Sequence, residues 1–274
     1  MKKKPTILIL LWLLLSPPLA VGESSCPRII SQSPYLTHTL DWLGLIPCIV
    51  GASRYDQGPW ADTGGVIDPD IATIRALEPQ LAITTHWTDP QLWGSLKETG
   101  SRTLILDGFQ GMAQITDKLR QIAAASGLNN GETMASDFER QWRDAAGRVG
   151  GQGQRSLLIS PCGGQPWLYG EGTWLYELFQ AAGFAVQSIG PGVQHVSVSE
   201  DEDHFATLLE KERPELVFAF INPASASCQA LIASRPVSII PLPAEQFTHP
   251  APGVVLEGLE QLAAMRGRWQ TNTE

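Results

Sequence analysis

The sequence predicts an α/β protein of two doubly wound lobes, each with a central parallel sheet, joined by a single long backbone helix, with a ligand cleft between the lobes. Three observations predict this fold. Strand-like apolar runs alternate with helix-like segments in both halves of the 274-residue chain. The alternation stops between residues 112 and 148, where only helical patterns occur. Glycine-containing breakers stand on both sides of the second of these helical segments.

The expected elements follow one another in a regular order. The first half has strand-like runs at residues 28–32, 48–51, 81–85 and 103–106, and helical segments at 35–43, 71–77 and 90–99. Two helical segments, 112–125 and 132–149, then follow each other without a strand. The second half has strands at 156–160, 185–189, 216–221 and 237–240, and helices at 173–182, 202–211, 227–234 and 254–265. We therefore expect an N-terminal lobe over residues 23–128, a linking helix over 129–150 and a C-terminal lobe over 151–274.

A faint internal repeat supports two lobes of like topology. The segment Leu77–Ile83 matches Glu212–Phe218, and each places a proline two residues before a leucine that begins a strand-like run. Such self-similarity within one chain is typical of a duplicated structural unit.

The first 22 residues are predicted to be a secretory signal peptide. Three lysines precede the apolar run Ile7–Leu15, a Ser-Pro-Pro break follows it, and small residues stand at Ala20 and Gly22. An apolar run of nine residues is too short to cross about 30 Å of hydrocarbon as a helix. We therefore expect an exported, periplasmic protein, and an uncleaved anchor is the less favoured interpretation.

The charge balance argues against nucleic acid as a partner. The chain has a formal net charge of -9, and the predicted signal segment contains three lysines and no acid. The rest of the chain carries 16 basic and 28 acidic side chains. Affinity for phosphate comes from lysine and arginine, so we expect no binding to nucleic acid and none to anionic membrane surfaces.

Four cysteines, all beyond the predicted signal segment, are expected to form two disulfides. An even number of cysteines in an exported protein favours pairing. Cys26 and Cys48 each precede a strand-like run, whereas Cys162 and Cys228 each follow one. We therefore expect the pairs Cys26–Cys48 and Cys162–Cys228. A cysteine metal site is disfavoured because the chain has no C-x-x-C spacing, and no metal site is predicted.

Aromatic side chains gather after the predicted strands, on the side where open α/β sheets bind ligands. Loops with several rings and few charges suit a large, flat, partly apolar ligand that is held by stacking. The alternative is that the rings fill the cores of the lobes. Ligand contact is favoured for the tryptophans as a group, because loops usually lie at the surface. The expected ligand contacts are Tyr35, Tyr55, Trp60, His86, Trp87, Trp93, Trp167, Trp174 and His249.

No catalytic motif accompanies these rings. The sequence lacks G-x-S-x-G, H-E-x-x-H, a P-loop, and a G-x-G-x-x-G segment after a strand. We therefore expect no catalytic residue and no enzymatic activity. An exported enzyme or metal-binding protein that uses His38, His86 and an acid remains the less favoured alternative.

With these residues placed, the chain resembles the periplasmic substrate-binding proteins of ABC transporters for vitamin B12, iron-siderophore and haem uptake. Arg28–Pro34 is similar to the opening strand and helix of that family, and Pro69–Leu81 is similar to its helix followed by a Pro-x-Leu strand start. Pro241–Leu242 and Pro250–Pro252 resemble its closing segment. The resemblance covers nearly all of residues 27–265.

Within the family, the cobalamin-binding members are the most similar. Tyr55, Trp87 and Trp167 fall where those proteins carry aromatic rings that stack on the ligand. The resemblance therefore implies a corrinoid such as cobalamin, captured between the lobes and delivered to a membrane permease. Haem and a ferric siderophore are the alternative ligands, with His86 or Tyr55 as an axial ligand.

The resemblance also implies a monomer without a cofactor of its own. Closure of the lobes should be small, because a linking helix resists bending. The glutamates with which the family usually docks onto its permease are replaced here by Ala72 and Thr207. Neighbouring acids are expected to take over this role, since opposite charges steer docking without an exact match of position. They are Asp68, Asp70, Asp201, Glu202 and Asp203.

Overall fold

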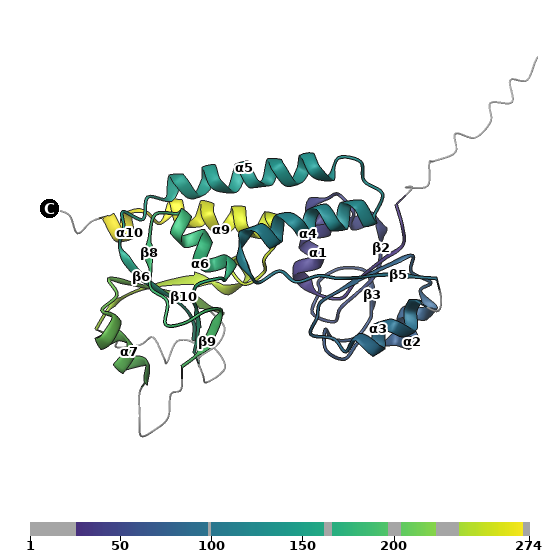
Figure 1. Cartoon of the computed structure of the whole chain (residues 1–274), viewed down its shortest axis with the longest axis horizontal. Coiled ribbons are helices and arrows are strands. Elements are labelled where there is room, and N and C mark those ends of the chain that lie inside the picture. The colour runs from purple at the N-terminus through teal and green to yellow at the C-terminus, as the bar shows by residue number, and fades with distance from the viewer. Residues whose placement is uncertain (1–25, 98–99, 162–165, 197–203, 223–235, 271–274) are drawn as a thin grey trace, which may run out of the picture.

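The computed structural model describes residues 26–97, 100–161, 166–196, 204–222 and 236–270. Two α/β lobes lie side by side beneath a long helix that reaches across both, which confirms the predicted fold class (Figure 1). Some predictions concern residues outside the described ranges. These are the signal peptide over 1–22, the helix over 227–234, Cys162, Cys228, Asp201, Glu202 and Asp203.

The N-terminal lobe is built on a five-stranded sheet in the order β3-β2-β1-β4-β5, in which every pair is parallel. Its strands are β1 (Ile29–Ser31), β2 (Ile49–Ala52), β3 (Ala61–Asp62), β4 (Leu81–Thr84) and β5 (Arg102–Ile105). Its helices are α1 (Pro34–Trp42), the 3-10 turn η1 (Ile46–Cys48), α2 (Ile71–Ala76) and α3 (Pro90–Lys97). Every residue of β1 and β4 is buried, as expected for a parallel sheet with helices on both faces.

The C-terminal lobe has a six-stranded sheet with a parallel centre and an antiparallel edge. Strands β8, β6, β10 and β11 are parallel, and β7 and β9 extend the sheet in antiparallel direction. The bounds are β6 (Arg155–Ser160), β7 (Trp167–Tyr169), β8 (Ala185–Val186), β9 (Val193–His195), β10 (Leu216–Ile221) and β11 (Ser238–Pro243). The helices are α6 (Trp174–Ala181), α7 (His204–Glu212), η2 (Ala244–Gln246), α9 (Pro252–Ala264) and α10 (Gly267–Gln270).

The antiparallel edge differs from the sequence prediction, which contained neither β7 nor β9. A strand of three residues is too short to show the alternation that identifies strands. The predicted strand over 185–189 is also shorter than expected, because only Ala185 and Val186 pair with β6.

Two consecutive helices, α4 (Gly111–Ala125) and α5 (Gly131–Val149), connect the lobes. Helix α5 packs on α4, α6 and α9 and runs over both lobes (Figure 1). Its buried side chains recur every three or four residues, which is the spacing of one helix face. No described helix is both long and apolar enough to cross a membrane.

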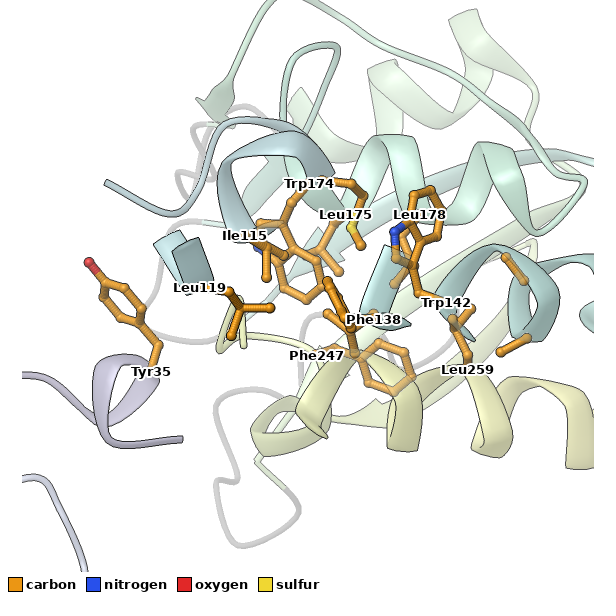
Figure 2. Packing of buried hydrophobic residues seen from close by; sticks show 14 of the residues in the cluster. Tyr35, Ile115, Leu119, Phe138, Trp142, Trp174, Leu175, Leu178, Phe247 and Leu259 are labelled. Atoms are coloured by element: carbon orange, nitrogen blue, oxygen red, sulfur yellow. The ribbon is translucent and has the colours of Figure 1, made fainter. Parts of the chain in front are cut away.

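The largest hydrophobic core continues from one lobe into the other. Phe138 and Trp142 of α5 point into it and meet side chains of α4, α6 and α9 (Figure 2). Phe138 also contacts the ring of Trp42 on α1, with ring centroids 6.1 Å apart. The lobes therefore share packed side chains as well as a covalent link.

The two lobes repeat the same device at the start of their central strands. Glu78 and Arg213 both have positive φ, 47° and 46°, and each is followed by a proline and then by β4 or β10. The Gln80 side chain accepts a hydrogen bond from the Arg28 backbone N–H (2.9 Å), and the Glu215 side chain accepts the equivalent bond from Arg155 (2.8 Å). The structure thus supports the internal repeat that the sequence suggested.

Gly150 ends the linking helix in the left-handed conformation, with φ 71° and ψ 58°. We expect Gly150→Ala to lower the free energy of unfolding by about 1 kcal/mol, because a Cβ is disfavoured at this φ. The new Cβ would lie 3.3–3.4 Å from the flexible ends of Gln270 and Arg266, so the cost comes mainly from the backbone. Urea denaturation measures it. Gly147→Ala, within the same helix, should instead leave stability unchanged or raise it.

Candidate functional site

The segments that follow the central strands meet where the two lobes join. The backbone N–H of Trp174, at the start of α6, donates to the Phe109 carbonyl after β5 (3.3 Å). The Glu177 carboxylate of α6 accepts from the Met112 N–H of α4 (2.7 Å). The segment between β5 and α4 is therefore anchored directly to the C-terminal lobe.

A cavity of about 820 Å³ lies between the lobes, and we call it the interlobe cavity. Helix α1 and the loop after β2 form one wall, and η2, the loop after it and α9 form the other. Of the predicted ligand contacts, Tyr55 and His249 line it. The full lining is Pro34, Thr37, His38, Asp41, Trp42, Tyr55, Asp56, Gln57, Glu245, Gln246, His249, Gly253, Val254 and Glu257.

The interlobe cavity has an unusual charge. Four carboxyl groups and two imidazoles line it, and none of its described lining residues is a lysine or arginine. The rings of His38 and His249 face each other across the lobe junction, with centroids 5.6 Å apart. Burial, together with the neighbouring His38, lowers the pKa of His249 to about 4, so its imidazole is neutral near pH 7. Burial also raises the pKa of Asp56. Such a lining favours a neutral or cationic ligand over one rich in carboxylates.

A second group of polar and aromatic side chains stands at the ends of β4 and β5, and we call it the strand-end cluster: His86, Trp87, Asp107 and Phe109. Thr84 and Ile105 pair at the ends of these parallel strands, so His86 and Asp107 each lie two residues further along. The imidazole Nδ1 of His86 contacts the Asp107 carboxylate. The rings of Trp87 and Phe109 are stacked, with centroids 5.0 Å apart and planes 29° apart.

The C-terminal lobe presents one more exposed ring beside a histidine. Trp167 on β7 lies opposite Ser160, the last residue of β6, and therefore stands at the carboxyl end of that central strand. Its ring centroid is 4.4 Å from that of His195 on β9. Three of the predicted ligand-contacting rings are thus well exposed: Tyr55 (61%), Trp87 (48%) and Trp167 (44%).

Three other residues that were expected to contact the ligand are buried and not exposed. Trp93 is 1% exposed and packs in the core beneath α2 and α3, and Trp174 is 1% exposed and packs in the main core. Both stand on helices, and their spacing to Leu96 and Leu178 places them on the inward faces. Tyr35 is buried as well, and its hydroxyl donates to the Leu106 carbonyl (3.0 Å) beneath Phe109. Trp60 is half-buried against the main core.

Two of the acids expected to dock onto a permease lie in the described residues and are exposed. Asp68 forms an ion pair with Arg54 (3.2 Å). Asp70 caps α2 by accepting from the backbone N–H and the hydroxyl of Thr73, and these bonds lower its pKa. Each of these two carboxylates therefore interacts with a neighbouring side chain and is also exposed to solvent.

Sequence reasoning did not identify most of the interlobe cavity. His38 and Asp41 are one turn apart on α1, and Glu257 stands on α9, so the cavity depends on how two distant helices pack. The only local signal is the spacing of Pro34, His38 and Asp41, which places polar groups on one face of α1. Trp42 has two environments, because it both contacts Phe138 and lines the cavity.

Comparison with known proteins gives a clear result for the fold. No protein-family model matches the sequence, and no curated protein is significantly similar to it in sequence. The periplasmic vitamin B12 binding protein BtuF of Vibrio cholerae superposes with a TM-score of 0.65 at 21% identity, over 90% of this chain and 99% of that one.

Two further solved structures share the fold. The periplasmic heme-binding protein RhuT from Roseiflexus sp. RS-1 in apo form gives a TM-score of 0.72 at 16% identity, covering 89% of this chain and 99% of that one. The siderophore binding protein BauB, bound to two acinetobactin molecules and ferric iron, gives 0.65 at 17% identity, covering 88% and 93%. The chain therefore has the two-lobed architecture of these binding proteins, as the sequence resemblance predicted.

Proposed function

We propose that this protein is the periplasmic substrate-binding component of an ABC importer for a metal chelate, and that the chelate is a corrinoid such as cobalamin. One observation carries the proposal. The two lobes together expose three large rings, Tyr55, Trp87 and Trp167, at the carboxyl ends of their central strands. Rings left exposed at the usual ligand side of α/β sheets suit stacking on a broad, flat ligand.

The charge of the interlobe cavity supports a corrinoid over the alternatives. Haem carries two carboxylates, and the described residues that line the cavity include no lysine or arginine to pair with them. A corrinoid presents amide groups, which the carboxylates and imidazoles of the cavity can hydrogen-bond without a charge conflict. In this proposal the protein acts as a monomer, needs no cofactor of its own, and docks onto the permease through Asp68, Asp70, Asp201, Glu202 and Asp203.

Cyanocobalamin titration monitored by tryptophan fluorescence tests the proposal. We expect saturable quenching in the wild type, and Tyr55→Ala, Trp87→Ala and Trp167→Ala should each weaken binding about tenfold, because each removes one stacking surface. Tyr176→Ala is the matched control: this ring lines a separate cavity between α4, α5 and α6, and its loss should leave affinity unchanged. Absence of quenching at high micromolar concentrations would contradict the corrinoid proposal.

Haem is the second candidate, and the strand-end cluster is the observation that favours it. His86 stands beside the exposed Trp87 with its Nδ1 held by Asp107, so a ring system stacked there would lie near an imidazole. A Soret band after addition of haemin, lost in His86→Ala, would favour this candidate. An unchanged haemin spectrum would count against it.

A further inference from the structure

The pairing of β4 with β5 brings a histidine and a carboxylate together at the ligand side of the N-terminal sheet. Both strands are parallel and end in register at Thr84 and Ile105. His86 and Asp107 follow at the same distance, so their side chains leave the sheet on the same side. The Nδ1 atom of His86 lies in contact with Oδ1 of Asp107.

This contact determines which nitrogen of the His86 imidazole is available to bind a ligand. With Asp107 as acceptor, Nδ1 carries the proton, and in the neutral ring the lone pair is on Nε2. Within the part of the chain that the structure describes, Nε2 makes no hydrogen bond. A histidine whose far nitrogen is held by a carboxylate, with Nε2 free, is the usual arrangement of a metal-ligating histidine.

Folding stability does not account for the pair. The side chains of His86 and Asp107 are 55% and 48% exposed. Ion pairs with both partners this exposed contribute little to stability. The imidazole is nevertheless oriented and accessible to solvent, so it is free to bind a ligand.

The surroundings indicate which kind of metal complex would fit. Trp87 follows His86 directly, with ring centroids 5.8 Å apart, and its indole is stacked on Phe109. Phe109 rests on the buried Tyr35, so the stack is supported from below. Because Trp87 remains 48% exposed, it offers open ring surface beside the imidazole. A flat chelate that covers this surface would bring its central metal toward Nε2.

We propose that His86 coordinates the metal of the bound chelate through Nε2 and that Asp107 is the positioning residue that orients its ring. The inference rests on the proposed function, because it concerns the same ligand. In aquocobalamin the water on cobalt leaves with its electron pair, and the lone pair of Nε2 forms the new cobalt–nitrogen bond without a change in oxidation state. The site therefore selects chelates whose axial position can exchange.

Two corrinoids that differ in this respect provide the test. Aquocobalamin carries an exchangeable water, whereas cyanide blocks that position in cyanocobalamin. We expect wild-type protein to bind aquocobalamin at least about tenfold more tightly and to shift its visible absorbance bands. His86→Ala should abolish the shift and reduce aquocobalamin affinity to that of cyanocobalamin. Cyanocobalamin affinity should fall by a smaller factor than aquocobalamin affinity in His86→Ala, because the blocked cobalt has no bond to Nε2 to lose.

A second pair of variants separates orientation from charge. Asp107→Asn should weaken aquocobalamin binding about tenfold and should change cyanocobalamin binding by a smaller factor. Asp144→Asn removes the same charge from the exposed face of α5 and should change neither. The spectral shift should also persist in His195→Ala, which removes the histidine beside Trp167.

The outcomes distinguish this inference from the proposed function. Binding of both corrinoids with an unshifted aquocobalamin spectrum would overturn histidine ligation and leave the binding function intact. A shift that survives His86→Ala, or that depends on His195 instead, would overturn it as well. Failure of the protein to bind either corrinoid or haemin would overturn the function and the inference together.

Discussion

Replacement of Lys118 with methionine is expected to stabilise the protein below pH 7, and the gain should shrink as the pH rises. Lys118 stands on α4 and is 1% exposed. Its Nζ donates to the Pro250 carbonyl of the C-terminal lobe (2.5 Å) and lies 4.4 Å from the centroid of the Tyr35 ring. Among the described residues no carboxylate pairs with it, so its charge is buried at a high cost.

The direction of the pH effect follows from the pKa of Lys118. Burial lowers this pKa from 10.5 in the unfolded chain to about 7 in the folded protein. Between these values the unfolded chain binds more protons, so the free energy of unfolding rises with pH. The destabilisation is complete below about pH 7 and disappears above about pH 10.5. The neighbouring Tyr35 stays protonated over this range, because burial raises its pKa.

Methionine keeps the length of the side chain and removes the charge. Relative to Lys118→Met, the wild type should gain about 3 kcal/mol of unfolding free energy between pH 6 and pH 9. The variant's advantage at pH 6 should therefore shrink by about 3 kcal/mol by pH 9, and because the variant loses the hydrogen bond to Pro250, the advantage should reverse above about pH 10.5. Denaturant unfolding of both proteins at several pH values measures this difference.

Lys97→Met is the matched control, because Lys97 is exposed on α3. It should show no comparable change with pH. A stability difference between wild type and Lys118→Met that stayed constant from pH 6 to pH 9 would show that Lys118 keeps an ordinary pKa.

The fold could be predicted from the sequence because its strongest signals are local. The helix expected over 132–149 corresponds to α5, since its buried positions repeat at helical spacing and Gly150 ends it. The alternation of strands and helices similarly predicted the parallel centre of both sheets. The edge strands β7 and β9 have only three residues each. They are strands because they pair with segments elsewhere in the chain, so no local pattern predicted them.

The candidate site was predictable only in part, for two physical reasons. Position after a strand does not say which way a ring points: Trp87 remains exposed, whereas Trp93 enters helix α3 and turns inward with Leu96. Residues that are brought together only by tertiary packing produce no local sequence pattern. His38 and His249 lie in different lobes, and only the packing of α1 against α9 brings their rings together.

Removal of the disulfide between Cys26 and Cys48 is the second change that we expect to have a large effect on stability. It confirms one of the two predicted pairs and joins the chain before β1 to the chain before β2, across a sequence separation of 22. Closing a loop of this length restricts the unfolded chain, so the Cys26→Ala, Cys48→Ala double variant should lose about 3 kcal/mol of unfolding free energy. For a chain of this size, Tm should fall by about 5–10 °C.

This test uses variants rather than reductant, because reductant would act on the predicted Cys162–Cys228 pair as well as on Cys26–Cys48. Addition of reductant to the double variant then reports on the second predicted pair: a further loss of stability indicates that Cys162–Cys228 forms. The Cys26–Cys48 bond lies at the amino ends of β1 and β2, whereas Tyr55, Trp87 and His86 follow the carboxyl ends of their strands. Corrinoid affinity measured well below the lowered Tm should therefore be unchanged. A weakened affinity in the folded double variant would show that the disulfide also positions the ligand-side loops of the N-terminal sheet.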